Sequence, residues 1–178
     1  MEKNIEFQDK HKTIDIGKAV VVAERVALHN VRVIKSSCLL KPSGTKGPYE
    51  VTLSQQEIDI QINKEKKTLV VLPSFSLNAF VINNKKDSPD FEISATFALT
   101  YTLEDLDDLS AENFQAFGHA NGIYNAWPYW REFIQSMTAR MGVPSLTIPV
   151  FRLSPPNNKK AEKLPAKKRV NKSAKKKK

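Results

Sequence analysis

The run from Phe91 to Leu103 constrains the fold most, because apolar and mostly polar side chains alternate along it almost without interruption. The apolar set is Phe91, Ile93, Ala95, Phe97, Leu99, Tyr101 and Leu103. A period of two is the side-chain period of a β-strand, so one face of this strand is predicted to be buried. Such a strand needs neighbouring strands in a sheet and a second layer to cover its apolar face.

Three further strand patterns precede this run. They cover residues 26–40, 51–62 and 69–82. In the second of them, Val51 and Leu53 are out of phase with the alternation that begins at Ile58, which predicts a bulge or break within 54–57. In the third, Pro73 removes a ladder donor, so the strand is expected to start afresh after it or to lie on an edge.

Two helices are predicted after the strands. The shorter covers 111–121, with Ser110 as its N-cap and with Phe114 and Phe117 facing inward. The link 122–125 separates it from a longer helix that begins at Pro128, where a missing N–H costs nothing. The apolar face of the longer helix comprises Trp130, Phe133, Ile134, Met137 and Met141. Gly142 is expected to end it in the left-handed conformation.

Strands in meander order followed by helices predict an α+β domain, a four-stranded antiparallel sheet with two C-terminal helices on one side. Residues 1–154 are assigned to this domain and 155–178 to a disordered Lys-rich tail. Ten Lys and one Arg against a single Glu give residues 159–178 a charge of +10, so 1–158 carry −1 of the formal net charge of +9. The tail either only solvates the chain or makes weak nucleic-acid contacts through phosphates.

The sequence offers no catalytic constellation. His11, His29 and His119 lack metal-ligand spacing, and no serine nucleophile motif or glycine-rich phosphate loop is present. We therefore expect no enzymatic activity, no metal and no cofactor. Cys38 is assigned to sheet packing. Without a membrane span, a signal peptide or paired cysteines, a cytoplasmic protein is expected.

The segment NAWPYWREFIQSMTARMGVPSLTIPV resembles the C-terminal region of the bacterial protein-export chaperone SecB. The matching residues are Asn125, Pro128, Tyr129, Arg131, Glu132, Ser136, Met137, Arg140, Pro144, Leu146 and Pro149. A second stretch, ERVALHNVRV, resembles the first strand of that family. Together the two stretches comprise 36 of the 178 residues of the chain. The family fold, a four-stranded antiparallel sheet followed by two helices, agrees with the fold predicted above.

The resemblance implies an ATP-independent holdase that binds unfolded preproteins or other non-native clients in apolar grooves during protein export and translocation. It also implies a homotetramer, built as a dimer of dimers whose helices pack between sheets. The residues expected in the client groove or at the subunit interface are Trp127, Trp130, Phe133 and Met137.

Two alternatives stay open. SecB-like chaperones also protect unstable antitoxins in toxin–antitoxin systems, which this sequence fits about as well. Contact with the export motor SecA is in doubt, because the positions that are acidic in the family are Asn30 and Ile34 here. The second alternative, from another class, is a nucleic-acid-binding module in which the small β-rich domain and the lysine tail act together.

Overall fold

The computed structural model describes residues 5–8, 15–42, 48–56, 58–82 and 88–151. The predicted Lys-rich tail, 155–178, lies outside this description. In chain order the elements are β1 (Ile5–Gln8), α1 (Ile16–Ala23), β2 (Val26–Leu40), β3 (Tyr49–Gln55), β4 (Asp59–Asn63), β5 (Thr68–Leu72), β6 (Ser74–Val81), β7 (Phe91–Leu103), α2 (Ala111–Phe117), the π-helical turn η1 (Gly118–Gly122) and α3 (Ile123–Arg140).

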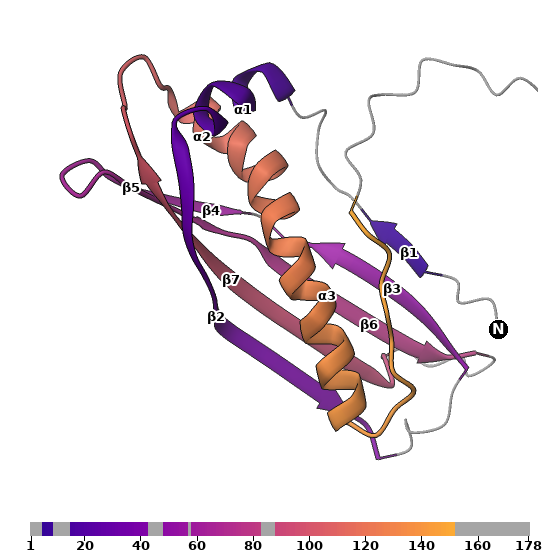
Figure 1. The fold of residues 1–178 in the computed structure, drawn as a ribbon. Coiled ribbons are helices and arrows are strands. Elements are labelled where there is room, and N and C mark those ends of the chain that lie inside the picture. Colours follow the sequence, from indigo (N-terminus) through magenta and orange to yellow (C-terminus); the bar gives the residue numbers. More distant parts are fainter. Residues whose placement is uncertain (1–4, 9–14, 43–47, 57, 83–87, 152–178) are drawn as a thin grey trace, which may run out of the picture.

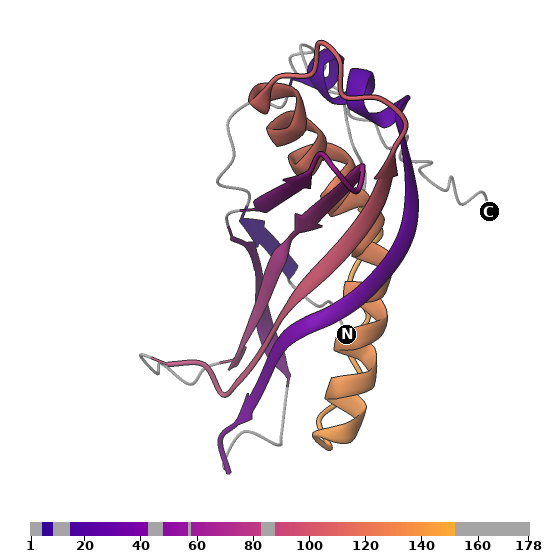
Figure 2. The ribbon, with the colours of Figure 1, turned by 90° about the vertical axis from the view of Figure 1, so that its left-hand side faces the viewer.

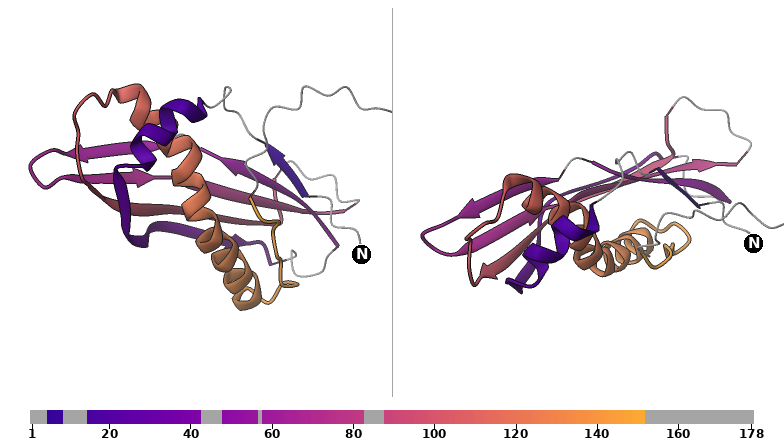
Figure 3. Two further views of the ribbon diagram at one scale, coloured as in Figure 1. Left: turned by 45° about the horizontal axis from the view of Figure 1, so that its top comes forward. Right: turned by 90° about the horizontal axis from the view of Figure 1, so that it is seen from above.

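The strands form one sheet in the order β1, β3, β6, β7, β5, β4, with β2 on the other side of β7 (Figure 1). Strands β5 and β6 both pair with the same edge of β7, one after the other along its length. On their other side, β4 pairs with β5 and β3 pairs with β6, so β3–β4 and β5–β6 each form one interrupted strand. The sheet therefore has four long antiparallel strands, two of them interrupted, and the short parallel strand β1. Figure 3 shows the helices on one side of this sheet, which confirms the predicted α+β class.

The predicted meander order is correct for the last three long strands and wrong for the first. Strand β2 pairs with β7 from Val26 opposite Leu103 to Leu40 opposite Phe91, and not with β3. The four long strands therefore follow a Greek-key order. Strand β2 has 15 residues and β7 has 13, so the two pair along their whole lengths. Alternation along a strand does not encode which neighbour it pairs with.

Both predicted strand interruptions are present. Pro73 separates β5 from β6, and its carbonyl accepts the N–H of Phe97 at 3.0 Å. The second break falls between Gln55, the last residue of β3, and Asp59, the first residue of β4. Interruptions at the same level of two adjacent strands allow the sheet to bend, and Figure 2 shows it curling toward α3.

The inward face of the sheet and α3 together form the core. All the apolar residues of the alternating run in β7 are buried, as predicted. From the helix side, Trp130 and Ile134 are 1% and 0% exposed. Burying each large apolar side chain stabilises the fold by about 1.5–3 kcal/mol, so this interface supplies much of the stability of the domain.

The helices form a continuous run from Ala111 to Arg140, which corrects the predicted break at 122–125 and the predicted start at Pro128. Pro128 lies inside α3. The two glycines of η1 bring the helix close to the sheet. A Cβ at Gly118 would lie 2.8 Å from the Cδ1 of Ile60, and one at Gly122 would lie 2.7 Å from the Cγ1 of Val71. Glycine here permits close packing of helix on sheet and does not end the helix.

Both outer ends of this helical run form as predicted. Ser110 caps α2 in a capping box with Asn113, and Phe114 and Phe117 are buried. At the other end, Gly142 has a φ of +70°. The N–H groups of Gly142 and Val143 donate to the carbonyls of Ala139 and Thr138, both at 3.2 Å, which is a Schellman motif.

Strand β1 and helix α1 were not predicted. The run Ile16–Ala23 is apolar almost throughout and so lacks the periodicity of an amphipathic helix. The sequence signal for this helix was Asp15 at its N-cap position, where the side chain accepts the N–H of Lys18 at 3.2 Å. Helix α1 packs on α2, and Lys18 forms an ion pair with Glu112. These contacts close the end of the molecule where the helical run begins (Figure 1).

Candidate binding groove

An aromatic cluster lies between α3 and the sheet. Phe75 of β6 stacks on Trp130 at a centroid distance of 5.6 Å and meets Trp127 edge-on at 5.8 Å. Trp130 in turn stacks on Phe133 at 6.1 Å, and Phe133 meets Phe97 edge-on at 6.5 Å. The cluster therefore extends from the buried interior at Trp127 to the half-buried Phe133, on the β2 side of the helix.

One flank of α3 is covered by the chain's own residues 143–151. The indole N–H of Trp127 donates to the carbonyl of Pro149 at 2.8 Å, and the Nε of Arg131 donates to that of Ile148 at 2.9 Å. Further along the helix, the Oγ1 of Thr138 accepts the N–H of Leu146 at 3.2 Å. The apolar residues that close this flank are Val143, Leu146 and Ile148. In Figure 1 this segment runs beside α3 on the side of β6 and β3.

The other flank of α3 is open and faces β2. A cavity of about 100 Å³ lies there. Its lining residues are Val31, Arg32 and Val33 of β2, Phe97 of β7, and Tyr129, Glu132 and Phe133 of α3. We call this set the β2–α3 groove. Its floor is apolar, with Phe97 buried at 2% exposure, while Val33 and Tyr129 are 43% and 46% exposed at its walls. A shallow apolar groove with one charge of each sign at its rim suits a polypeptide segment better than a compact small molecule.

Strand β2 is also a free edge of the sheet, since within the described residues it pairs only with β7. Its exposed large apolar residues are Leu28, Val33, Ile34 and Leu39. The pairing with β7 shifts between Leu28 and Asn30 and again between Val33 and Lys35, so β2 is bulged at His29 and Ile34. A long, apolar edge strand is a template for pairing with another chain unless it is covered. Because Val33 belongs to both, the groove and this edge form one continuous surface.

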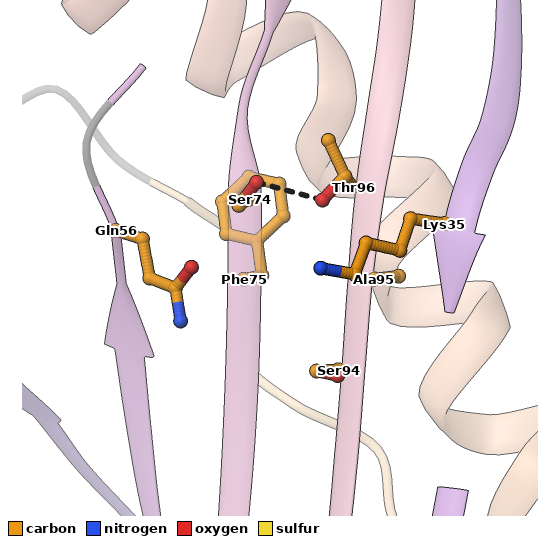
Figure 4. Close-up of a pocket in the computed structure, with 7 residues that line it drawn as sticks. All are labelled: Lys35, Gln56, Ser74, Phe75, Ser94, Ala95 and Thr96. Carbon is orange, nitrogen blue, oxygen red and sulfur yellow. Dashed lines mark hydrogen bonds between the residues drawn. The ribbon is translucent and has the colours of Figure 1, made fainter. Parts of the chain in front are cut away.

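The opposite face of the sheet is polar. Figure 4 shows a hollow there, with Lys35 reaching toward Ser74 and Thr96, whose hydroxyls are 2.8 Å apart. Beside it, the hydroxyls of Ser54 and Ser76 are 2.7 Å apart. Hydroxyl pairs across adjacent strands stabilise a solvated face and offer little apolar surface. Of the two faces of the sheet, the helix-covered face with the β2–α3 groove is therefore the more apolar.

Burial dominates the pKa shifts of two titratable groups in the sheet, Cys38 and Tyr101. Burial raises the pKa of the Cys38 thiol, which favours its protonated form. Burial also raises the pKa of Tyr101 to about 12, and a hydrogen bond from Asn125 opposes that shift. No group of three or more His, Cys, Asp or Glu within the described residues could hold a metal ion. None of the helices in the same part of the chain is long and apolar enough to cross a membrane.

The four residues predicted for the groove or the subunit interface occupy different environments. Trp127 and Trp130 are 5% and 1% exposed and pack against this chain's own sheet. Phe133 lines the β2–α3 groove, and Met137 is half-buried against the core. Contact with a client or a second subunit stays a prediction for all four.

The structure adds groove residues that the sequence did not single out. Val31 and Val33 contribute from β2, and Tyr129 from α3, one turn before Phe133. The spacing of Tyr129 and Phe133 placed them on adjacent turns of one helix. No sequence signal placed that helix beside β2, because the Greek-key pairing of β2 decides it. Of the two positions expected to bear on SecA contact, Asn30 lies opposite Thr100, and Ile34 is a bulge residue with 49% exposure.

No protein-family model matches the chain, and no curated protein matches it either. Among solved structures, its fold is similar to that of the SecB-like chaperone of Mycobacterium tuberculosis in complex with a ChAD peptide from the HigA1 antitoxin. The TM-score is 0.66 at 19% identity, over 76% of this chain and 96% of that chain. A protein of unknown function from Streptococcus agalactiae matches with a TM-score of 0.39 at 14% identity, over 70% of this chain and 96% of that chain. The first match confirms the SecB-like fold.

Proposed function

We propose that this chain is an ATP-independent holdase that binds non-native polypeptide segments in the β2–α3 groove. The carrying observation is that a SecB-like fold presents an apolar groove beside a long, uncovered edge strand. A client gains affinity by burying its apolar side chains on Phe97, Phe133 and Val33, and its main chain can pair with the free edge of β2. Neither interaction needs a nucleotide or a catalytic residue.

Two cellular roles fit this activity. In protein export, the clients are unfolded preproteins, handed on with or without SecA. In a toxin–antitoxin system, the client is the unstable antitoxin, and this role is favoured by the structural neighbour solved with a peptide from an antitoxin. The genes beside this one distinguish the two roles, because a dedicated chaperone is expected next to its toxin–antitoxin pair.

We further propose that the chain assembles into a homotetramer, a dimer of dimers. The exposed apolar residues of β2 support this, since an edge strand of 15 residues is rarely left uncovered in a soluble protein. Light scattering at micromolar concentration should give the mass of a tetramer, or at least of a dimer. A strictly monomeric protein would count against the SecB-like assembly.

The groove is tested by Val33→Asp, with Ser37→Asp on the same strand as the matched control. Val33 lines the groove, whereas Ser37 is exposed and lies opposite Ser94 on the polar face. A carboxylate in the groove should weaken client affinity about tenfold or more, since burying a valine is worth about 1.5 kcal/mol or more and 1.4 kcal/mol is a factor of ten. Suppression of aggregation of a chemically unfolded protein is the measurement, with the oligomer mass checked alongside. Equal losses in both variants would reject the groove.

The nucleic-acid alternative is separated by ending the chain at Asn158, which removes the +10 charge of residues 159–178. A holdase that works through the groove should suppress aggregation as well as the full chain does. A nucleic-acid-binding module should instead lose most of its RNA affinity together with a steep salt dependence. If the shortened chain no longer prevents aggregation while the full chain binds RNA tightly, the holdase proposal fails.

A further inference from the structure

The hollow on the polar face of the sheet has a volume of about 100 Å³. Figure 4 shows Lys35 and Gln56 on opposite sides of it, with the hydroxyl pair of Ser74 and Thr96 between them. Small side chains on adjacent strands keep this space open. The lining residues are Lys35 of β2, Gln56 just after β3, Ser74 and Phe75 of β6, and Ser94, Ala95 and Thr96 of β7.

A bulge in β2 places Lys35 at the hollow. Val33 is in register with Phe97 and lines the β2–α3 groove, whereas Lys35 is in register with Thr96 and lines the hollow on the other face. Residues two apart in a regular strand share a face, so the extra residue Ile34 turns Lys35 away from the face of Val33. Bulges are frequent beside functional sites, where they re-aim a side chain. Here the bulge supplies the hollow with a cation.

The hollow combines one positive charge with several hydrogen-bond donors. The Lys35 ammonium has three donors and no acceptor, and it forms no ion pair with any described residue. In the pair of Ser74 and Thr96, 2.8 Å apart, one hydroxyl donates to the other, which leaves the second O–H available to donate outward. None of the lining residues is acidic. A group that only accepts hydrogen bonds and carries a negative charge therefore complements the hollow.

We propose that this hollow binds a carboxylate group, held by the Nζ of Lys35 and by the hydroxyl pair of Ser74 and Thr96. A carboxylate carries one negative charge and accepts at both oxygens, which matches a single cation, whereas a phosphate group carries about −1.5 to −2 at neutral pH. The amide of Gln56 donates to the second oxygen from the far side. The source is a small free acid or an acidic side chain of a polypeptide that lies over the sheet. Because the hollow and the β2–α3 groove lie on opposite faces, this site does not depend on the holdase function.

The first test titrates the full chain with sodium acetate and follows the backbone amide signals by NMR. Acetate should shift the signals of Lys35, Ser74 and Thr96 to saturation, and sodium chloride at equal ionic strength should not. Lys35→Met should weaken acetate binding at least about tenfold, or about 1.4 kcal/mol, because it removes a charge-assisted hydrogen bond. The matched control is Lys64→Met, the same change at an exposed lysine between β4 and β5. Equal shifts with chloride, or equal acetate affinity in the two variants, would overturn the proposal.

The second test removes a hydroxyl and leaves the charge in place. Thr96→Val keeps the shape of the side chain and should weaken acetate binding about fivefold, as expected for the loss of one neutral hydrogen bond. Thr100→Val is the matched control, since Thr100 lies on the same strand and does not line the hollow. The same amide spectra report whether both variants keep the fold. A Thr96 variant that binds acetate as tightly as the Thr100 variant contradicts the site.

Two peptides identify the source of the carboxylate. The probes are acetyl-Gly-Glu-Gly-amide and the same peptide with Gln in place of Glu, which has the shape and lacks the charge. The Glu peptide should shift the same three amide signals, and the Gln peptide should not. Tighter binding of the Glu peptide than of acetate assigns the site to a polypeptide, and equal or weaker binding assigns it to a small acid. Equal affinity for the Glu and Gln peptides would show that no carboxylate is recognised.

Discussion

On one flank of α3 the chain's own residues 143–151 lie against the helix, whereas on the other flank the helix faces β2 across an open groove. The covered flank is held by side chains that donate to main-chain carbonyls, Trp127 to Pro149 and Arg131 to Ile148. The open flank presents Tyr129 and Phe133 with no covering segment among the described residues. The comparison shows how an extended polypeptide lies beside α3, since the chain already provides one such segment for itself.

The two flanks of α3 therefore have different roles. Bonds from side chains to carbonyls hold a segment without regard to its sequence, and buried apolar side chains anchor it. On the covered flank the anchors are Leu146 and Ile148 of the same chain. On the open flank a client must supply the anchors. The covered flank therefore contributes to stability, and the open flank is expected to contribute to binding.

The largest effect is expected from Trp130→Ala, which removes the centre of the aromatic cluster. Trp130 is 1% exposed and stacks on both Phe75 and Phe133. The free energy of unfolding should fall by about 3–5 kcal/mol, the usual cost of truncating a buried aromatic residue. Urea denaturation measures it. The neighbouring Tyr129→Ala, at a half-exposed residue, should change stability by no more than about 0.5 kcal/mol, and similar losses in both would erase the distinction between the two roles.

A smaller effect on stability is expected from Thr138→Val, which breaks the link between α3 and the covering segment. The Oγ1 of Thr138 is the acceptor for the N–H of Leu146. Valine keeps the shape and leaves this buried donor without its partner, at a cost of about 1–3 kcal/mol. Amide exchange should accelerate at Leu146 and not along β2. The exposed Thr147→Val is the control, and unchanged exchange at Leu146 would show that this bond does not hold the flank closed.

The smallest effect on stability and a clear effect on binding are expected from Tyr129→Ala. Its side chain forms a wall of the β2–α3 groove, so client affinity should fall about tenfold through lost apolar contact. Fluorescence anisotropy with a labelled unfolded protein measures this. Tyr124→Ala is the matched control, because Tyr124 is a tyrosine of the same helix, 54% exposed, and does not line the groove. An equal loss in the control would move the binding site away from the groove.

The four long strands were predictable because each carries its own signal. The alternation in β7, the phase change after Leu53 and the break at Pro73 are local properties of the chain. The cap at Ser110 and the helix end at Gly142 are likewise local. Fold class followed from these elements, and the solved SecB-like structure agrees with it.

Several errors in prediction concern the helices. Gly122 was interpreted as part of a break and Pro128 as the first turn of the longer helix, because both residues disfavour helix interiors in isolation. In the structure, close packing of the helix on Val71 favours the glycine, and Pro128 is accommodated inside α3. Helix α1 was overlooked because a short apolar run has no period to detect. At Gly122, a contact with Val71, distant in the sequence, decided the outcome.

The sequence by itself determined the four long strands, the inward face of β7, the two ends of the helical run, the apolar face of the long helix and the uneven charge of the chain. Only the tertiary structure decided that β2 pairs with β7, that Trp130 is interior while Tyr129 and Phe133 line a groove, and that β1 covers β3. The physical reason is the separation in sequence over which each kind of interaction acts. Periodicity and capping act between residues a few positions apart, whereas strand pairing and groove walls join residues that no local signal relates.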